Sequence, residues 1–458
     1  MKKIFFLPLF LFGLAFAQEL NYSGSLTALA GAGLAEDNAG NFLAGQLAFD
    51  NTLKAYIGDS MFCLNAAIVA DGTQSQSTNG ISNFASDDGI FSIKLKEAYF
   101  DYNGGFWSVR AGRQIAAWGK ADGIQVADIL CPQDESNLIA STYKESRLGI
   151  DALRVSFMGN FFQSDLYWIP IFTPSTLPLA EKSVLRKVVF PDRYENFALN
   201  CPRKWNDFDL PGLKHENSEF AARVGFYFSK FDLSFYGFYG WDDLPFFSYN
   251  AVSKNEVVVT GTYKRMGMLG ADAAIPMGDF VFRLETAFFP QRNIQTSAEW
   301  QAERQMEGLA FDGSKHCNQL VALAGFDWTP SGGWTITAQY IADAAFASKS
   351  KINKFDGSGQ LVASWEEDPL DRKVYVHRAS LTVEKTLLNE SLTLSALAFL
   401  DLNDFSSATE LSAEYALTDA IKLGLVGNLF FKGIDGRDGL YGGYSGLTCL
   451  TLKGVVSF

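Results

Sequence analysis

The chain ends with the stretch GLTCLTLKGVVSF (residues 446–458), in which apolar and polar side chains alternate. One set of positions holds Leu450, Leu452, Val456 and Phe458, and the other holds Cys449, Thr451, Lys453 and Ser457. Successive side chains of a β-strand point to opposite sides. The stretch therefore predicts a strand with one oily face and one polar face.

The same alternation recurs along the chain in segments of roughly ten residues. Examples are FAARVGFYF (220–228), FVFRLETAFF (280–289), HRASLTVEK (377–385) and IKLGLVGNLFF (421–431). The predicted strands are 20–32, 41–56, 60–71, 90–102, 105–114, 148–158, 160–170, 218–229, 231–241, 257–274, 279–290, 317–328, 334–345, 374–386, 391–402, 407–416, 421–432 and 444–458.

The gaps between these strands alternate between short and long, except for a short gap near Asn403 where a long one is expected. Short periplasmic turns and long external loops are typical of up-and-down barrels in an outer membrane. Lipid offers no hydrogen bonds, so such a sheet must close on itself. We predict an all-β transmembrane antiparallel barrel of about 18 strands, with 16 strands as the alternative count. A soluble secreted β-domain is the alternative fold.

The N-terminus predicts export. Lys2 and Lys3 precede an apolar run that ends in Ala15-Phe16-Ala17, as in a secretory signal peptide. We expect residues 1–17 to be cleaved and residues 18–458 to form a single barrel, integral to the outer membrane. The alternating last strand ends in Phe458, which resembles the C-terminal signal that the barrel-assembly machinery reads. Outer-membrane lipid is the other expected partner.

Composition excludes several other classes. The formal net charge is −13, which argues against a nucleic-acid partner. Three His and five Cys without a CxxC pair give no zinc pattern, and we expect no metal and no cofactor. Cys131 and Cys201 each precede a proline in a long loop, so they are the candidate disulfide pair.

If the oily face meets lipid, the polar face lines the lumen, and a barrel of this size leaves an aqueous channel. The candidate pore-lining or constriction residues are Lys94, Lys96, Arg110, Arg154, Arg223, Arg283, Glu285 and Arg378. Asp165, Glu219 and Glu384 fall on the same face. The basic excess favours anionic solutes. The alternative is that these charges pair with each other and brace a plugged lumen.

Two long loops carry their own patterns. Loop 115–147 follows a strand and begins IAAWGKADGIQVADILCPQD. Its motif residues, counted from the end of the strand, are Arg113, Trp118, Asp122, Asp128, Pro132 and Asp134. We expect this loop to fold into the barrel mouth, with Trp118 packing and the aspartates bonding backbone N–H groups or inward arginines. A cap that only stabilises the wall is the alternative. Loop 171–217 predicts a folded external or lumen-inserting segment, with a short helix in LAEKSVLRK (179–187).

The stretch around loop 115–147 also carries a resemblance. It resembles the EAY-x-D, GRQ-x-x-x-WG and D-x-x-x-P-x-D core of a family of uncharacterised, porin-like outer-membrane barrels of Gram-negative bacteria. The matching residues are Glu97, Ala98, Tyr99, Asp101, Gly112, Arg113, Gln114, Trp118, Gly119, Asp128, Pro132 and Asp134. The resemblance implies association with transporters of the resistance-nodulation-division superfamily that move hydrophobic molecules. Cys131 and loop 171–217 depart from the pattern.

These patterns predict a porin-like channel that passes small or poorly soluble solutes, with loop 115–147, and also 171–217, as candidates for the constriction. A barrel-anchored surface-binding or adhesin-like protein is the first alternative. An outer-membrane enzyme is the second, but the chain has no GxSxG elbow and few histidines to serve as a base. We therefore predict that the chain is not an enzyme.

Overall fold

The computed structural model describes residues 17–73, 83–86, 88–136, 142–180, 182–190, 203–206, 208–253, 256–355, 360–367 and 369–458. Most of them belong to one antiparallel sheet of 19 strands. The short β4 (Asn83–Ala85) pairs with β5, so eighteen strands form the wall. The predicted strand number is confirmed. The predicted signal peptide lies outside the described residues except for Ala17.

The wall strands follow the chain in order around the barrel. They are β1 (Glu19–Gly33), β2 (Phe42–Ile57), β3 (Ser60–Asp71), β5 (Phe91–Asn103), β6 (Trp107–Gln114), β7 (Ile150–Met158), β8 (Phe162–Ile171), β10 (Glu219–Tyr227), β11 (Asp232–Trp241), β14 (Arg265–Met277), β15 (Phe280–Gln295), β16 (Ser314–Trp328), β17 (Trp334–Phe346), β20 (Tyr375–Leu387), β21 (Leu392–Asp401), β22 (Ser407–Ala416), β23 (Ile421–Phe431) and β24 (Cys449–Ser457). The first strand pairs with both β2 and the last strand, which closes the sheet. Closure gives each edge a hydrogen-bonding partner, as a bilayer requires.

The C-terminal residue completes this closure. The backbone N–H of Phe458 donates to Gly24 O at 3.0 Å, and the N–H of Gly24 donates back at 2.9 Å. The Phe458 ring lies 5.8 Å from Tyr22 and 5.9 Å from Phe49, so it joins an aromatic group at the short-turn end. Its recognition by an assembly machinery stays a prediction.

Short turns gather at one end of the barrel and long loops at the other. The predicted short gap near Asn403 is also present, because β21 and β22 are joined by residues 402–406 alone. Along the strands, apolar side chains face outward and alternate with buried or half-buried ones. On β15, for example, Phe282 and Leu284 are exposed whereas Glu285 is buried. No helix in the described part of the chain is both long and apolar enough to span a bilayer.

One predicted strand has the wrong bounds. Residues 257–274 form two strands, β13 (Glu256–Thr262) and β14, and only β14 belongs to the wall. The first pairs with β12 (Phe246–Ser253) and with β9 (Arg203–Trp205) in a separate small sheet. Alternation continues through both strands, so the sequence pattern does not show that the pairing partner changes at Tyr263 and Lys264.

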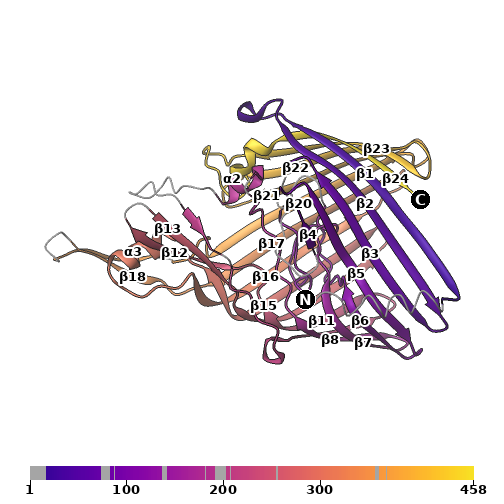
Figure 1. Cartoon of the computed structure of the whole chain (residues 1–458), viewed down its shortest axis with the longest axis horizontal. Coiled ribbons are helices and arrows are strands. Elements are labelled where there is room, and N and C mark those ends of the chain that lie inside the picture. Colours follow the sequence, from indigo (N-terminus) through magenta and orange to yellow (C-terminus); the bar gives the residue numbers. More distant parts are fainter. Residues whose placement is uncertain are drawn as a thin grey trace.

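The long loops build a cap beyond the barrel (Figure 1). It contains the small sheet, the hairpin of β18 (Ser350–Phe355) and β19 (Leu361–Glu367), and α3 (Ala298–Met306). Ser297 caps α3 by accepting the N–H of Trp300, as favoured at helix N-termini. The short helix predicted in loop 171–217 is present as α2 (Val184–Val189). The described residues also form three 3-10 turns: η1 (Glu36–Asn38), η2 (His215–Asn217) and η3 (Gly442–Leu447).

Candidate functional site: a divided barrel lumen

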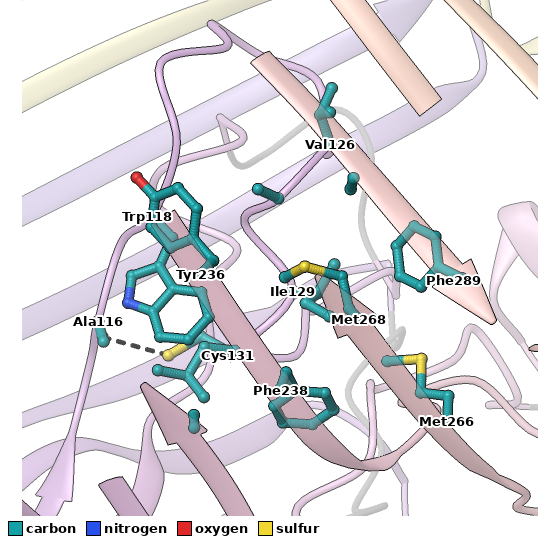
Figure 2. Packing of buried hydrophobic residues seen from close by; sticks show 14 of the residues in the cluster. Ala116, Trp118, Val126, Ile129, Cys131, Tyr236, Phe238, Met266, Met268 and Phe289 are labelled. Atoms are coloured by element: carbon teal, nitrogen blue, oxygen red, sulfur yellow. Dashed lines mark hydrogen bonds between the residues drawn. The ribbon is translucent and has the colours of Figure 1, made fainter. Parts of the chain in front are cut away.

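Residues 115–136, named here the inner loop, leave the end of β6 and fold into the barrel. Their apolar side chains are buried against inward side chains of the wall, as Figure 2 shows for Trp118, Val126 and Ile129. The wall partners include Tyr236, Phe238, Met266, Met268, Ala287, Phe289, Val321, Leu323 and Ile341. These belong to β11, β14, β15, β16 and β17.

An apolar core therefore lies inside the lumen. The sequence predicted a polar inner face throughout, and this is wrong for the side of the wall from β7 to β17. There the inward side chains contact a folded loop and not water. Burying each large apolar side chain stabilises this docking by about 1.5–3 kcal/mol.

The Trp118-Gly119 pair fixes where the inner loop meets the wall. The Trp118 ring centroid lies 5.1 Å from that of Tyr236 and 6.1 Å from that of Tyr167. Gly119 has φ +76°, and a Cβ there would lie 2.4 Å from Glu285 Oε1. A glycine is required because other residues would be strained and would displace the carboxylate.

Glu285 is the main polar anchor of the inner loop. Its carboxylate accepts backbone N–H groups from Lys120 at 2.5 Å, Ala121 at 2.8 Å and Ala127 at 2.7 Å. Hydrogen bonds to an ionised acceptor are roughly twice as strong as neutral ones. The sequence placed Glu285 on the inner face, and the structure assigns it to the loop backbone.

Two neighbouring side chains extend this anchor. Gln339 on β17 accepts the backbone N–H of Asp122 at 2.9 Å and donates to its carbonyl at 2.8 Å. Arg283 donates to Lys120 O at 2.9 Å and pairs with Asp327. Gln339 is neutral and was not singled out from sequence; its inward position was its only signal.

Two of the three motif aspartates, Asp128 and Asp134, brace the base of the inner loop, whereas Asp122 contributes its backbone groups to Gln339. Asp128 accepts the backbone N–H of Trp118 at 2.9 Å, and its other oxygen accepts the Tyr143 hydroxyl and pairs with Arg147. Asp134 pairs with Lys94 at 2.9 Å. Although burial raises the pKa of Asp134, Lys94 and Ser136 hold it below its ordinary value. Both carboxylates thus act within the loop and its wall contacts.

The remaining motif residues are also structural in this arrangement. Arg113 is buried and donates to Asp151 at 2.9 Å and to Gly149 O at 2.7 Å. Pro132 is fully buried, and its carbonyl accepts the N–H of Leu148. Cys131 is a free thiol whose Sγ accepts the N–H of Ala116 at 3.2 Å, and burial raises its pKa to about 12. Its predicted disulfide partner, Cys201, lies outside the described residues.

Most of the other predicted inward cations pair with carboxylates. Lys96 pairs with Asp50, Arg110 with Asp101, Arg154 with Asp165, and Arg378 with Asp343. Arg223 lies over the Tyr236 ring, 6.0 Å from its centroid. A register shift opposite Asn65 and Ala66 lets Lys94, Lys96 and Glu97 all reach the loop side of the wall.

The opposite side of the lumen is less filled. A cavity of about 420 Å³, named here the lateral cavity, lies between the inner loop at Gly123 and inward side chains of β20–β23. A second cavity of about 550 Å³, the mouth cavity, lies under the cap. Phe246, Phe247 and Phe190 form its apolar side, and Arg292 and Arg372 its polar side. In the part of the chain that the structure describes, no group of three or more His, Cys, Asp or Glu side chains is arranged to hold a metal ion.

Comparison with solved structures shows a shared barrel fold. OccK8 (OprE) of Pseudomonas aeruginosa is 10% identical with a TM-score of 0.52, covering 97% of this chain and 98% of that chain. Acinetobacter baumannii OccAB1 is 9% identical with a TM-score of 0.52, covering 97% of both chains. The BenF-like porin from Pseudomonas fluorescens Pf-5 is 10% identical with a TM-score of 0.50, covering 97% and 99%. The fold thus matches integral outer-membrane porins.

No curated protein matches the sequence. The family model described as "Protein of unknown function (DUF1302)" matches residues 14–429, and the chain belongs to this family.

Proposed function

We propose that the chain is an outer-membrane channel in which the inner loop closes one side of the lumen and small solutes pass along the other. A wall of eighteen strands encloses enough space for an aqueous path unless the lumen is filled. The barrel fold shared with porins supports the proposal. The observation that carries it is the asymmetric position of the inner loop, which packs on the wall from β7 to β17 and leaves the lateral cavity against β20–β23.

The lining of the two cavities favours small amphipathic solutes, because it contains both aromatic and charged side chains. The anionic and hydrophobic solutes expected from sequence remain the two classes to compare. Because most of the inward cations pair with carboxylates, we expect only weak ion selectivity. Association with a resistance-nodulation-division transporter stays an expectation of the sequence resemblance.

The test is single-channel recording of the purified protein in a planar bilayer under a salt gradient. Stable steps of current are expected. A folded barrel that gives no steps at any voltage would contradict the proposal. The cap of small sheets would then favour the alternative of a barrel-anchored surface-binding protein.

A further inference from the structure

The lateral cavity has a more specific chemistry than an open water path needs. Its lining combines the rings of Phe399, Phe430 and Tyr441 with three groups that form hydrogen bonds: Arg378, Glu410 and Asn428. A pore that only conducts water and ions needs polar side chains in its lining, but it does not need aromatic rings. This combination is typical of a ligand site, where an apolar lining carries a few placed polar groups.

Two donors of the cavity lack ordinary acceptors. The Arg378 Nε and the Asn428 Nδ2 are both buried and have no hydrogen-bond partner among the described residues. Asn428 is 7% exposed, and the Cys449 thiol beside it is only a weak acceptor. The Arg378 guanidinium hydrogen-bonds the Tyr441 side chain and is 3.8 Å from Asp343, so its charge is only loosely paired with a carboxylate. A buried donor without a partner costs free energy, which a ligand oxygen would recover.

The acceptor of the cavity, Glu410, lies two strands from Arg378 and is displaced along the sheet, because Arg378 pairs with Asp401 whereas Glu410 pairs with Leu397. Arg378 is on β20 and Glu410 is on β22, with Phe399 on the strand between them. Strands two apart in a sheet are separated by roughly 10 Å. The four-residue offset between Asp401 and Leu397 adds roughly 13 Å along the strands. Phe399, Ala408 and Phe430 share the row midway between the two polar ends, so a ring that lies over Ala408 would have Arg378 on one side and Glu410 on the other. Glu410 and Asn428 are cross-strand partners, which places an acceptor and a donor side by side at the far end.

We propose that the lateral cavity binds a compact aromatic solute with a carboxylate at one end and a hydroxyl at the other. The carboxylate accepts from Arg378, the ring packs between Phe399 and Phe430, and the hydroxyl donates to Glu410 while accepting from Asn428. This inference rests on the proposed function, because the lateral cavity is then a binding site on the route that solutes take through the channel.

The test uses 4-hydroxybenzoate as the probe, with benzoate and 4-hydroxybenzyl alcohol as analogues that each lack one polar end. Binding to the purified full-length barrel is measured by calorimetry, and block of the KCl current is measured in a bilayer. The probe is expected to bind about tenfold or more tightly than the alcohol, since a hydrogen bond to a charged group is lost. Benzoate is expected to fall between them.

Substitutions of the lining residues test which side chain binds each end of the ligand. Arg378→Gln should lower affinity for 4-hydroxybenzoate to near that of the alcohol and leave alcohol binding unchanged. Glu410→Ala should remove the advantage of 4-hydroxybenzoate over benzoate, and Glu410→Gln, which keeps one acceptor oxygen, should only reduce it. Lys422→Gln is the matched control for lumen charge, because Lys422 pairs with Glu414 on the neighbouring strand and does not line the cavity.

The outcomes separate the two proposals. A KCl current that none of the three compounds blocks, with no binding heat, overturns the binding site and leaves the channel in place. Binding that depends on Arg378 in a barrel without current supports the site and overturns the channel. Equal effects of Arg378→Gln and Lys422→Gln on 4-hydroxybenzoate affinity would reduce the site to a general effect of charge and overturn it.

Discussion

At the scale of single residues, Glu285 decides whether the inner loop stays docked. Replacing it with Ala leaves three backbone N–H groups of the loop without their acceptor. Each unmet buried donor costs about 1–3 kcal/mol. We expect Glu285→Ala to raise single-channel conductance and to make the current fluctuate as the loop leaves the wall.

Two variants control for this effect. Glu285→Gln keeps one side-chain oxygen and should lie between wild type and Ala. Glu414→Ala removes a carboxylate that pairs with Lys422, and should leave the conductance unchanged. Steady wild-type conductance in Glu285→Ala would show that the apolar core alone holds the loop.

A second residue, Asp243, should make the stability of the barrel depend on pH. Burial, together with nearby Glu219 and Asp242, raises the pKa of Asp243 well above its ordinary value, against the opposing effect of Arg292. A carboxyl with a raised folded-state pKa binds its proton more tightly in the native state. The free energy of unfolding therefore falls as pH rises from about 4 through the folded-state pKa.

Asp243→Asn removes the group whose deprotonation lowers the free energy of unfolding at high pH. We expect its urea midpoint, read from the mobility shift between folded and unfolded barrel on gels, to exceed that of wild type at pH 8 and to match it near pH 4. Asp435→Asn, at an exposed loop position, is the control and should match wild type at both pH values. A wild-type midpoint that rises between pH 5 and pH 8 relative to Asp243→Asn would reverse the assigned sign.

Alternation along the strands predicted which cations face inward, but it could not predict what they contact. Alternation places Arg283 and Arg378 on the polar face, whereas their acidic partners, Asp327 and Asp343, lie on other strands. Such pairs depend on strand register and on the path of a loop, and neither is written in the local pattern. For the same reason Gln339 and Tyr236 could not be singled out.

At the scale of elements, the alternating segments predicted all eighteen wall strands, because period-two patterning is imposed by lipid on one side. The sequence pattern did not predict the register shift on β5 or the division of residues 257–274 between β13 and β14. The shift adds one residue to one strand without breaking the apolar run. The cap sheet depends on the parallel pairing of β9 with β13, which joins distant segments.

The inner loop can be tested as a unit. The backbone N–H of Ala116 bonds Cys131 Sγ, so the two ends of the excursion lie close together and a short linker can join them. We expect replacement of residues 117–129 by Gly-Gly to keep the barrel closed, to raise the conductance severalfold and to lower the urea midpoint. The midpoint falls because the apolar wall is then exposed to water.

Removal of residues 299–308, which contain most of α3, is the matched control. This helix lies in the cap beyond the barrel (Figure 1), so its loss should not change the conductance. If the loop replacement leaves conductance at the wild-type value, the inner loop does not restrict the path.

At the scale of the whole molecule, the lumen is filled asymmetrically although the barrel wall is regular. One side of the lumen is an apolar core that holds the inner loop, and the other keeps space next to aromatic and charged side chains. Closure and strand count followed from the sequence because they depend on repeated local signals. The division of the lumen did not, because it depends on where one loop packs.

The most direct test of this division is cysteine accessibility during current recording, in a protein whose five native cysteines are replaced by serine. Ala408→Cys lines the lateral cavity on β22, and Val321→Cys lies on β16 under the inner loop. A charged thiol reagent is expected to reduce the current through Ala408→Cys and to leave that through Val321→Cys unchanged. Reduction at Val321→Cys, or an unchanged current at Ala408→Cys while ions still pass, would contradict the account.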